Sequence, residues 1–281
     1  MLIDPLSEVL SFLKARTCVA GGYDFGGNWS IQYDMHDGIK CFAVVAGRCS
    51  LEVDAGVEPI QLQVGDCVLL PSGRRFRFAK DLSFESVDIT ELSETDWCGG
   101  IATVDGGGDT LILGGHFAFS GEHASMLLGA MPPILRLLED GDKEELRWVL
   151  ERMRRELTAK RPGGVLIVQN LAQLLLVEAL RLYLAHGSGR VPGWLFALGD
   201  SRLAPAVIAM HANPGANWTL PLLAERAGMS RSKFAHRFKT VTGLSPIDYL
   251  LRWRILLACD RLIARREPLS KGGTKRSEPC C

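Results

Sequence analysis

The chain has 281 residues, of which 47% are hydrophobic and 23% charged, with 32 Lys and Arg balanced by 32 Asp and Glu. This composition is that of a folded protein and excludes an intrinsically disordered chain, a collagen-like repeat and a small disulfide scaffold. At about 150 residues per domain, the length predicts two domains.

The N-terminal segment carries Asp4 and Glu8 where a secretory signal would be basic and then apolar, so we expect a cytoplasmic protein. The most apolar stretch, residues 162–177, is shorter than the roughly 20 residues needed to cross a bilayer, and polar amides interrupt it. We therefore expect no membrane partner. The cysteines form no C-x-x-C pair and have no His at ligand spacing, which favours buried reduced thiols over a zinc or redox site.

Short apolar runs separated by Gly, Asp and Pro extend from about residue 23 to 90, which predicts an antiparallel β-sandwich or barrel at about 20–115. The glycine-rich segment 104–110 lacks the spacing of a phosphate-binding motif, so we expect a loop there. From about 121 to 186 the apolar residues recur three and four apart. This period predicts helices, one of them broken at Pro132-Pro133.

A segment rich in Gly and Pro follows, and we expect a linker over 187–200. The remaining chain is basic, because residues 202–281 hold 14 Lys and Arg against 5 Asp and Glu. That balance makes a polyanion a candidate partner.

Two short helices are predicted in this basic part. Thr219 can cap the first, whose inward residues we expect to be Leu222, Leu223 and Ala227, and Gly228 ends it.

Ser230 is placed to cap the second helix, in which Phe234, Phe238 and Val241 recur at one buried face before Gly243 ends it. Two helices joined by a tight turn predict a helix-turn-helix, whose second helix can lie in the major groove of DNA.

The other face of the second helix combines base-edge hydrogen bonders with cations and contains no carboxylate. One stripe holds Ser232, His236, Lys239 and Thr240, and beside it lie Arg231, Lys233 and Arg237. A solvated face of a small helical domain is the alternative interpretation. The cap, the turn glycine, the aromatic spacing and the absence of acid together favour double-stranded DNA as the partner.

Residues 224–262, AERAGMSRSKFAHRFKTVTGLSPIDYLLRWRILLACDRL, closely resemble the DNA-binding region of AraC/XylS-type transcription regulators. The family's G-x-S-P-x-x-Y motif and the helix after it are matched by Gly243, Ser245, Pro246, Tyr249, Arg252, Arg254, Ala258 and Leu262. The resemblance implies that Ser232, Ala235 and His236 lie where base-reading side chains lie, with Arg231 and Lys239 near phosphates. It also implies a small-molecule effector, with RNA polymerase as a further partner.

The sequence departs from this family after residue 270. A family member continues into a second helix-turn-helix, whereas this sequence has a tail without apolar periodicity, which we expect to be disordered over 266–281. The alternative function is therefore a truncated ligand-binding or dimerisation partner that no longer binds DNA specifically.

The N-terminal zone resembles the cupin-like sensor domain of such regulators, with GRCSLEV followed by VGDCVLLPSGRRFRF. Phe76 stands where a metal-binding cupin has its His, and His36 lacks the paired His and Glu of such a site. We therefore expect no metal and no other cofactor. No nucleophile elbow or paired-carboxylate spacing occurs, so we expect no catalytic residues and no enzyme activity.

A small barrel can enclose one small molecule. The candidate effector-binding residues are Trp29, Tyr33, His36 and Phe42, together with the basic run Arg74, Arg75 and Arg77. Packing in the core and at the rim explains these residues equally well. Strand alternation puts Arg75 and Arg77 on the face opposite Phe76 and Phe78.

The predicted helix in 142–157 carries an apolar stripe of Leu146, Val149, Leu150, Met153 and Leu157. The resemblance suggests that such helices form a homodimer, and covering the barrel is the alternative. The predicted fold is α+β: a cupin-like antiparallel β-barrel with a helical layer over residues 1–186, the linker, and an all-α helix-turn-helix domain over 201–265.

Overall fold

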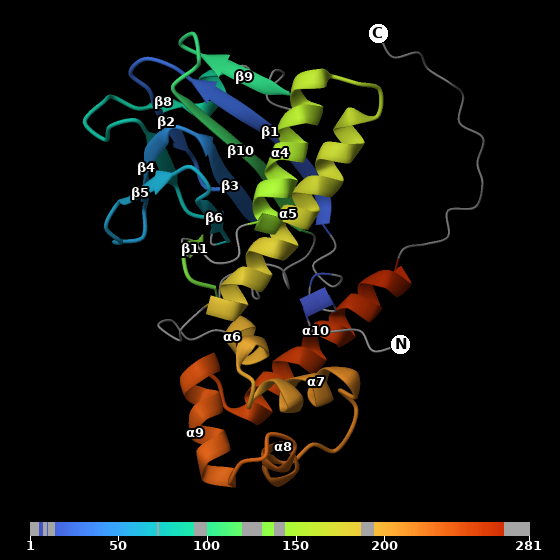
Figure 1. Cartoon of the computed structure of the whole chain (residues 1–281). Coiled ribbons are helices and arrows are strands. Elements are labelled where there is room, and N and C mark those ends of the chain that lie inside the picture. The colour runs from blue at the N-terminus through green and yellow to red at the C-terminus, as the bar shows by residue number, and fades with distance from the viewer. Residues whose placement is uncertain are drawn as a thin grey trace, which may run out of the picture.

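The computed structural model describes residues 6, 7, 10, 15–71, 73–92, 100–119, 131–137, 144–186 and 194–266. Within these residues two β-sheets form the N-terminal part, helices cover one of them, and a group of mostly shorter helices forms the C-terminal part (Figure 1). The predicted α+β architecture, a β-barrel with a helical layer followed by an all-α domain, is confirmed.

The sheet that carries the helices, called the large sheet, has six strands among the described residues, in the spatial order β11–β6–β3–β10–β1–β9. Their bounds are β1 (Ala15–Phe25), β3 (Ile39–Ala46), β6 (Cys67–Leu70), β9 (Ile101–Val104), β10 (Thr110–Phe119) and β11 (Leu135–Leu137). All neighbouring pairs are antiparallel except β1 and β9.

The opposing small sheet has five strands in the same part of the structure, in the order β5–β4–β7–β2–β8. Their bounds are β2 (Ser30–Tyr33), β4 (Arg48–Val53), β5 (Ile60–Gln63), β7 (Phe76–Ala79) and β8 (Val87–Asp88), and a 3-10 helix η1 (Ile89–Glu91) follows. Here β2 and β8 form the parallel pair.

The space between the two sheets is filled by aromatic and aliphatic side chains, which form the barrel core. Its largest members are Tyr23, Phe25, Trp29, Tyr33, Phe42, Phe76 and Phe78. Successive residues of a strand point to opposite sides, so the same strands of the large sheet also present an apolar outer face.

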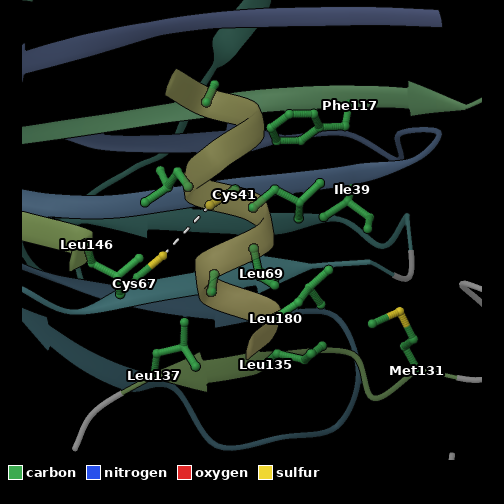
Figure 2. Close-up of a cluster of buried hydrophobic side chains, with 14 of the residues drawn as sticks. Ile39, Cys41, Cys67, Leu69, Phe117, Met131, Leu135, Leu137, Leu146 and Leu180 are labelled. Carbon is green, nitrogen blue, oxygen red and sulfur yellow. Dashed lines mark hydrogen bonds between the residues drawn. The ribbon is translucent and has the colours of Figure 1, made fainter. Parts of the chain in front are cut away.

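That outer face packs against helices to form a second core (Figure 2). Cys41 and Cys67 meet in it with their sulfur atoms 3.7 Å apart, and the hydrogen bond between them, together with burial, raises the pKa of Cys41. These two cysteines, together with Cys18 and Cys49, are buried, as predicted, whereas Cys259 is half-buried. Cys98, Cys280 and Cys281 lie outside the described residues.

Helices α4 (Glu144–Ala159) and α5 (Gly164–His186) provide this cover. Every member of the apolar stripe predicted for α4, from Leu146 to Leu157, is buried. The buried residues of α5 recur three and four apart, at Val168, Leu171, Ala172, Leu175, Leu176, Ala179 and Leu180. This spacing places one continuous face of α5 on the sheet and on α4.

Residues 164–184 of α5 are long and apolar enough to cross a membrane, by length and composition alone, with a mean hydropathy of 1.6. Of its most apolar window, 39% is buried inside the protein. The helix owes its apolar composition in part to its role in the second core, because its buried positions contact β1, β6, β10 and β11.

One segment differs from the predicted helix. Residues 135–137 form strand β11 on the free edge of β6, with Leu135 paired to Leu69 and Leu137 to Cys67. Pro132 and Pro133 have no N–H to donate and disfavour a helix that includes the residues before them. Residues 120–130, the rest of that predicted helix, lie outside the described residues.

The C-terminal part consists of α6 (Trp194–Gly199), α7 (Ala204–Ala212), α8 (Leu220–Arg226), α9 (Arg231–Thr242) and α10 (Pro246–Arg266). Helix α6 lies within the predicted linker, whose residues 187–193 are outside the described ones. Ala197, Val207, Phe234 and Phe238 belong to the same continuous core as the outer face of the large sheet.

Replacing Leu175 by Ala is expected to lower the free energy of unfolding by about 2–5 kcal/mol, because it leaves a cavity between α5 and the large sheet. Leu175 is 0% exposed and its neighbour Leu174 is 37% exposed. Leu174→Ala is therefore the matched control and should cost less than about 1 kcal/mol. Urea unfolding of both variants measures the difference, and equal losses would contradict this orientation of α5.

Candidate nucleic-acid interface and barrel site

Helix α8 begins as predicted. Thr219 holds the N-cap position, and its hydroxyl accepts from the N–H of Leu222 at 3.5 Å. The prediction that Leu222 points inward is wrong, since that side chain is 45% exposed. Leu223 is buried as predicted and Ala227 is half-buried, while Ala224 is buried in place of Leu222.

The turn between α8 and α9 depends on Gly228, whose φ of +60° is the left-handed conformation that glycine adopts without strain. Ser230 then takes the N-cap position of α9 with an extended backbone, although its hydroxyl makes no capping hydrogen bond. Gly243, with φ 78°, ends α9 and donates its N–H to the carbonyl of Lys239 at 2.8 Å. The predicted helix-turn-helix geometry is present.

Phe234 and Phe238 are fully buried, as their spacing predicts. Val241, predicted to complete this face, is only partly buried, and Thr242 is the buried residue of that last turn. Its hydroxyl donates to the carbonyl of Phe238 at 2.8 Å and accepts from the N–H of Leu244. The polar group is therefore satisfied inside the core.

The opposite face of α9 is exposed. It presents Arg231, Ser232, Lys233, His236, Arg237, Lys239 and Thr240, with Ala235 half-buried between them. Every residue predicted to contact DNA thus lies on one helix, and that helix contains no Asp or Glu. The hydroxyl of Thr240 donates to the carbonyl of His236 at 2.9 Å and can still accept a hydrogen bond.

Arg237 differs from the other cations of α9, because it is bound to Asp200. Its Nε and Nη2 lie 2.8 and 2.7 Å from the same carboxylate oxygen, Oδ2. The other oxygen accepts from the N–H groups of Arg202 and Leu203 at the start of α7. Asp200 therefore fixes α9 to the junction of α6 and α7, a contact that the sequence pattern did not reveal.

Helix α10 packs against α9 and α8. Ser245 precedes it in a reciprocal cap, in which the hydroxyl donates to Asp248 at 2.6 Å and accepts from the N–H of that residue. Arg254 donates to the carbonyls of Pro214 and Ala216, which fastens the loop before α8.

His211 of α7 is buried against α10. Its ring stacks on Trp253 with 3.9 Å between centroids, and its Nε2 lies 2.8 Å from the hydroxyl of Tyr249. Burial lowers the pKa of His211 to about 4, so the ring is neutral at pH 7.

In the barrel, three of the four predicted effector-binding residues are packed in the core. The ring centroids of Tyr33 and Phe42 lie 5.7 Å apart. Tyr33 stacks on Phe76 with 4.4 Å between the ring centroids. Trp29 lies at the other end of β2, stacked on Phe25 at 4.1 Å. His36 is half-buried and meets the edge of Phe76, so the structure brings together Tyr33, His36 and Phe42 but not Trp29.

Lys40 and His116 lie at the end of the barrel that carries Tyr33, His36 and Phe42. Lys40 on β3 is directly opposite His116 on β10, and the ring of His116 lies 6.0 Å from that of His36. Alternation with Phe42 places Lys40 on the inner face of β3, a signal that the sequence offered. The position of Lys40 opposite His116 depends on the register between β3 and β10, which the sequence pattern does not determine.

Arg75 and Arg77 point away from the barrel core, as alternation predicts. They pair with Asp34 and Glu52, each at 3.0 Å, on the outer surface of the small sheet. Arg74 donates to the carbonyl of Asp54.

A cleft of ≈ 540 Å³ lies beside these arginines, and another of ≈ 810 Å³ lies around Arg48, Lys80 and Asp109. Neither cleft is lined by Trp29, Tyr33, His36 or Phe42. Within the described residues, no three His, Cys, Asp or Glu side chains lie together in a way that could hold a metal ion.

Two families of known proteins match the N-terminal and the C-terminal part of the chain. Residues 4–185 match the cupin family and residues 223–271 match a family described as a helix-turn-helix domain. A protein of Streptomyces lividans named as an AraC-like transcription regulator is 38% identical over 92% of this chain and 86% of its own length. One of Streptomyces antibioticus with the same designation is 35% identical over 95% and 88%. Among solved structures, ToxT from Vibrio cholerae aligns with 84% of this chain and 97% of its own at a TM-score of 0.33 and 12% identity.

The ion pair between Asp200 and Arg237 is expected to stabilise the fold by about 0.5–1.5 kcal/mol of coupling energy. Asp200→Asn keeps an oxygen for the N–H groups of α7 and removes only the charge, and Arg237→Gln removes the partner. Urea unfolding of both single variants and the double variant gives the coupling. If the free energy of unfolding of the double variant falls by the sum of the two single decreases, the pair does not hold α9.

Stability should fall with acid through His211. The unfolded chain binds a proton at this residue near pH 6.5 and the folded protein only near pH 4, so the free energy of unfolding decreases as pH falls from about 6.5 to about 4. His211→Phe keeps the aromatic stack but cannot ionise. Between pH 6.5 and pH 4 the free energy of unfolding of this variant should therefore fall less than that of the wild type, by up to about 3 kcal/mol. Denaturant unfolding at several pH values measures this difference. Parallel pH profiles would contradict this role of His211.

Proposed function

The chain belongs to the AraC-like transcription regulators, and on that premise we propose that α9 is its DNA-reading helix and that the barrel senses a small molecule. The observation that carries the first part is the exposed face of α9, with its cations, hydrogen-bonding side chains and complete lack of carboxylates. A helix of this kind fits the major groove, where side chains reach base edges and cations reach phosphates.

The proposal gives the residues of α9 different tasks. Ser232, Ala235 and His236 face the bases, where a hydroxyl or an imidazole can hydrogen-bond and a methyl group can contact thymine. Arg231, Lys233 and Lys239 have no ion-pair partner among the described residues and are free to contact phosphates. Arg237 is already bound to Asp200, so it positions the helix and takes a smaller share of the phosphate charge.

A barrel joined to a DNA-binding domain supports regulation by ligand binding rather than catalysis. The ligand would change how α9 is presented, because α9 and the helices on the large sheet share one core. We infer that the protein acts in the cytoplasm, where it meets double-stranded DNA and RNA polymerase.

We further propose that the regulator is a homodimer. The exposed face at the start of α5 carries Val165, Leu166 and Ile167, which a second copy can cover. Two reader helices related by a two-fold axis would contact two half-sites, so the bound DNA should contain a spaced repeat.

Selection from random DNA duplexes at several salt concentrations tests the assignment. Wild-type protein should enrich a motif. His236→Ala should lose base preference at one or two positions, by about 1–3 kcal/mol, whereas Lys239→Met should weaken binding to all sequences alike and reduce the salt slope by about one. The binding constants of the enriched and a random duplex measure both effects.

Lys160→Met is the matched control, because Lys160 is an exposed cation between α4 and α5, remote from α9 in the chain. It should bind DNA as the wild type does. If the wild-type protein retains DNA in a steeply salt-dependent way but enriches no motif, its binding is electrostatic only. That outcome would overturn sequence-specific recognition. Equal effects of His236→Ala and Lys239→Met on both duplexes would overturn their separate roles.

A further inference from the structure

We propose that the outer face of α10 is a contact surface between two copies of this chain, in which the two helices pack antiparallel around Leu251. The surface is formed by Ile247, Leu251 and Ile255, together called the outer ridge. It is separate from the contact proposed for the start of α5, and it requires neither DNA nor a bound ligand.

The outer ridge consists of large apolar side chains that are exposed to solvent. Ile247, Leu251 and Ile255 are 43%, 54% and 50% exposed. Their spacing of four residues places them one above the other along one side of the helix. Leu222 on α8 and Ile208 on α7 are exposed as well, but each is the single exposed large apolar residue of its helix, which the structure describes in full. Scattered residues of that kind are common on protein surfaces, whereas a continuous row indicates a contact surface.

The chain does not use the outer ridge for its own packing. The residues of α10 that pack on the rest of the C-terminal part are Tyr249, Leu250, Trp253 and Leu256, and their spacing places them on the opposite side of the helix. Helix α10 therefore has two apolar faces, and the described residues cover only one of them. A helix that is apolar on both faces is normally buried on both, which points to a partner on the second face.

The spacing within the outer ridge suits an identical ridge. Side chains four residues apart form a row that fits into the groove of a similar helix, and two helices packed in this way cross at about 50°, the commonest angle in globular proteins. A two-fold axis near Leu251 would bring Leu251 of the two copies together and place Ile247 of each copy beside Ile255 of the other. The same surface then serves both copies, as a two-fold contact requires.

The charges beside the outer ridge select the antiparallel orientation. Asp248 and Arg252 are exposed on the same flank of the ridge, and neither forms an ion pair within the described residues. One carboxylate oxygen of Asp248 accepts from Ser245 at 2.6 Å, which fixes its position at the start of α10. In an antiparallel contact Asp248 of each copy comes near Arg252 of the other, whereas a parallel contact brings Arg252 near Arg254. Complementary charges of this kind make a second copy the fitting partner.

The contact is small, because two crossing helices share only about three turns. It buries less than the roughly 1,200 Å² of a stable complex, so the association is weak and depends on protein concentration. Sedimentation equilibrium of the full chain over a wide range of concentrations measures it. The Leu166→Glu variant removes the contact proposed for the start of α5 and isolates the outer ridge. This variant should still form a reversible dimer.

Two further substitutions in the Leu166→Glu variant test the details of the contact. Adding Leu251→Glu should weaken the dimer about tenfold or more, because it places two carboxylates at the centre of an apolar contact. Adding Arg252→Glu instead should weaken it about threefold or more, because Asp248 then faces an acid. Leu222→Glu and Arg226→Glu are the matched controls, since they make the same changes at exposed positions of α8. Both controls should leave the dimer unchanged.

Circular dichroism verifies that each variant is folded. A Leu166→Glu variant that is monomeric at every concentration, or equal effects of Leu251→Glu and Leu222→Glu, would overturn the proposal. Arg252→Glu without effect would overturn the antiparallel orientation. Equal association of wild type and Leu166→Glu would support the outer ridge and contradict the contact at α5. None of these measurements involves DNA, so they are independent of the proposed role of α9.

Discussion

The structure depends on the contact between α5 and the outer face of the large sheet. The barrel core is enclosed by its own two sheets, but the second face of the large sheet is equally apolar and needs a cover. Helix α5, with its buried positions three and four apart, provides that cover together with α4. At about 25 cal/mol per Å² of apolar surface, this burial is a major stabilising contribution to the N-terminal domain.

The same helix connects the two domains. Its last turns approach α6 so closely that a methyl group at Gly199 would lie 2.7 Å from the carbonyl oxygen of Leu184. The next residue, Asp200, holds Arg237 of α9. From the large sheet to α9 there is thus an unbroken series of packed contacts through α5 and α6, so the position of α9 is tied to that of α5. Continuous packing of this kind can carry a structural change from one domain to the other.

One end of the barrel combines packed aromatic rings with basic side chains. The ring of Phe76 stacks on that of Tyr33, with 4.4 Å between the ring centroids. Lys40 and the neutral His36 and His116 gather at the same end.

Much of this protein is determined by local sequence. The alternating strands, the helix period of α4 and α5, the turn at Gly228 and the left-handed end at Gly243 each follow from the conformational preference or spacing of a few neighbouring residues. The residues that we propose to contact DNA share α9 because they are close in the chain. The strand at Leu135–Leu137, the exposure of Leu222, the pairing of Arg237 with Asp200 and the meeting of Lys40 with His116 were decided only by the tertiary structure. Each joins segments that are 37 to 76 residues apart, or depends on which neighbour covers a short element, and no local period or propensity encodes such a contact.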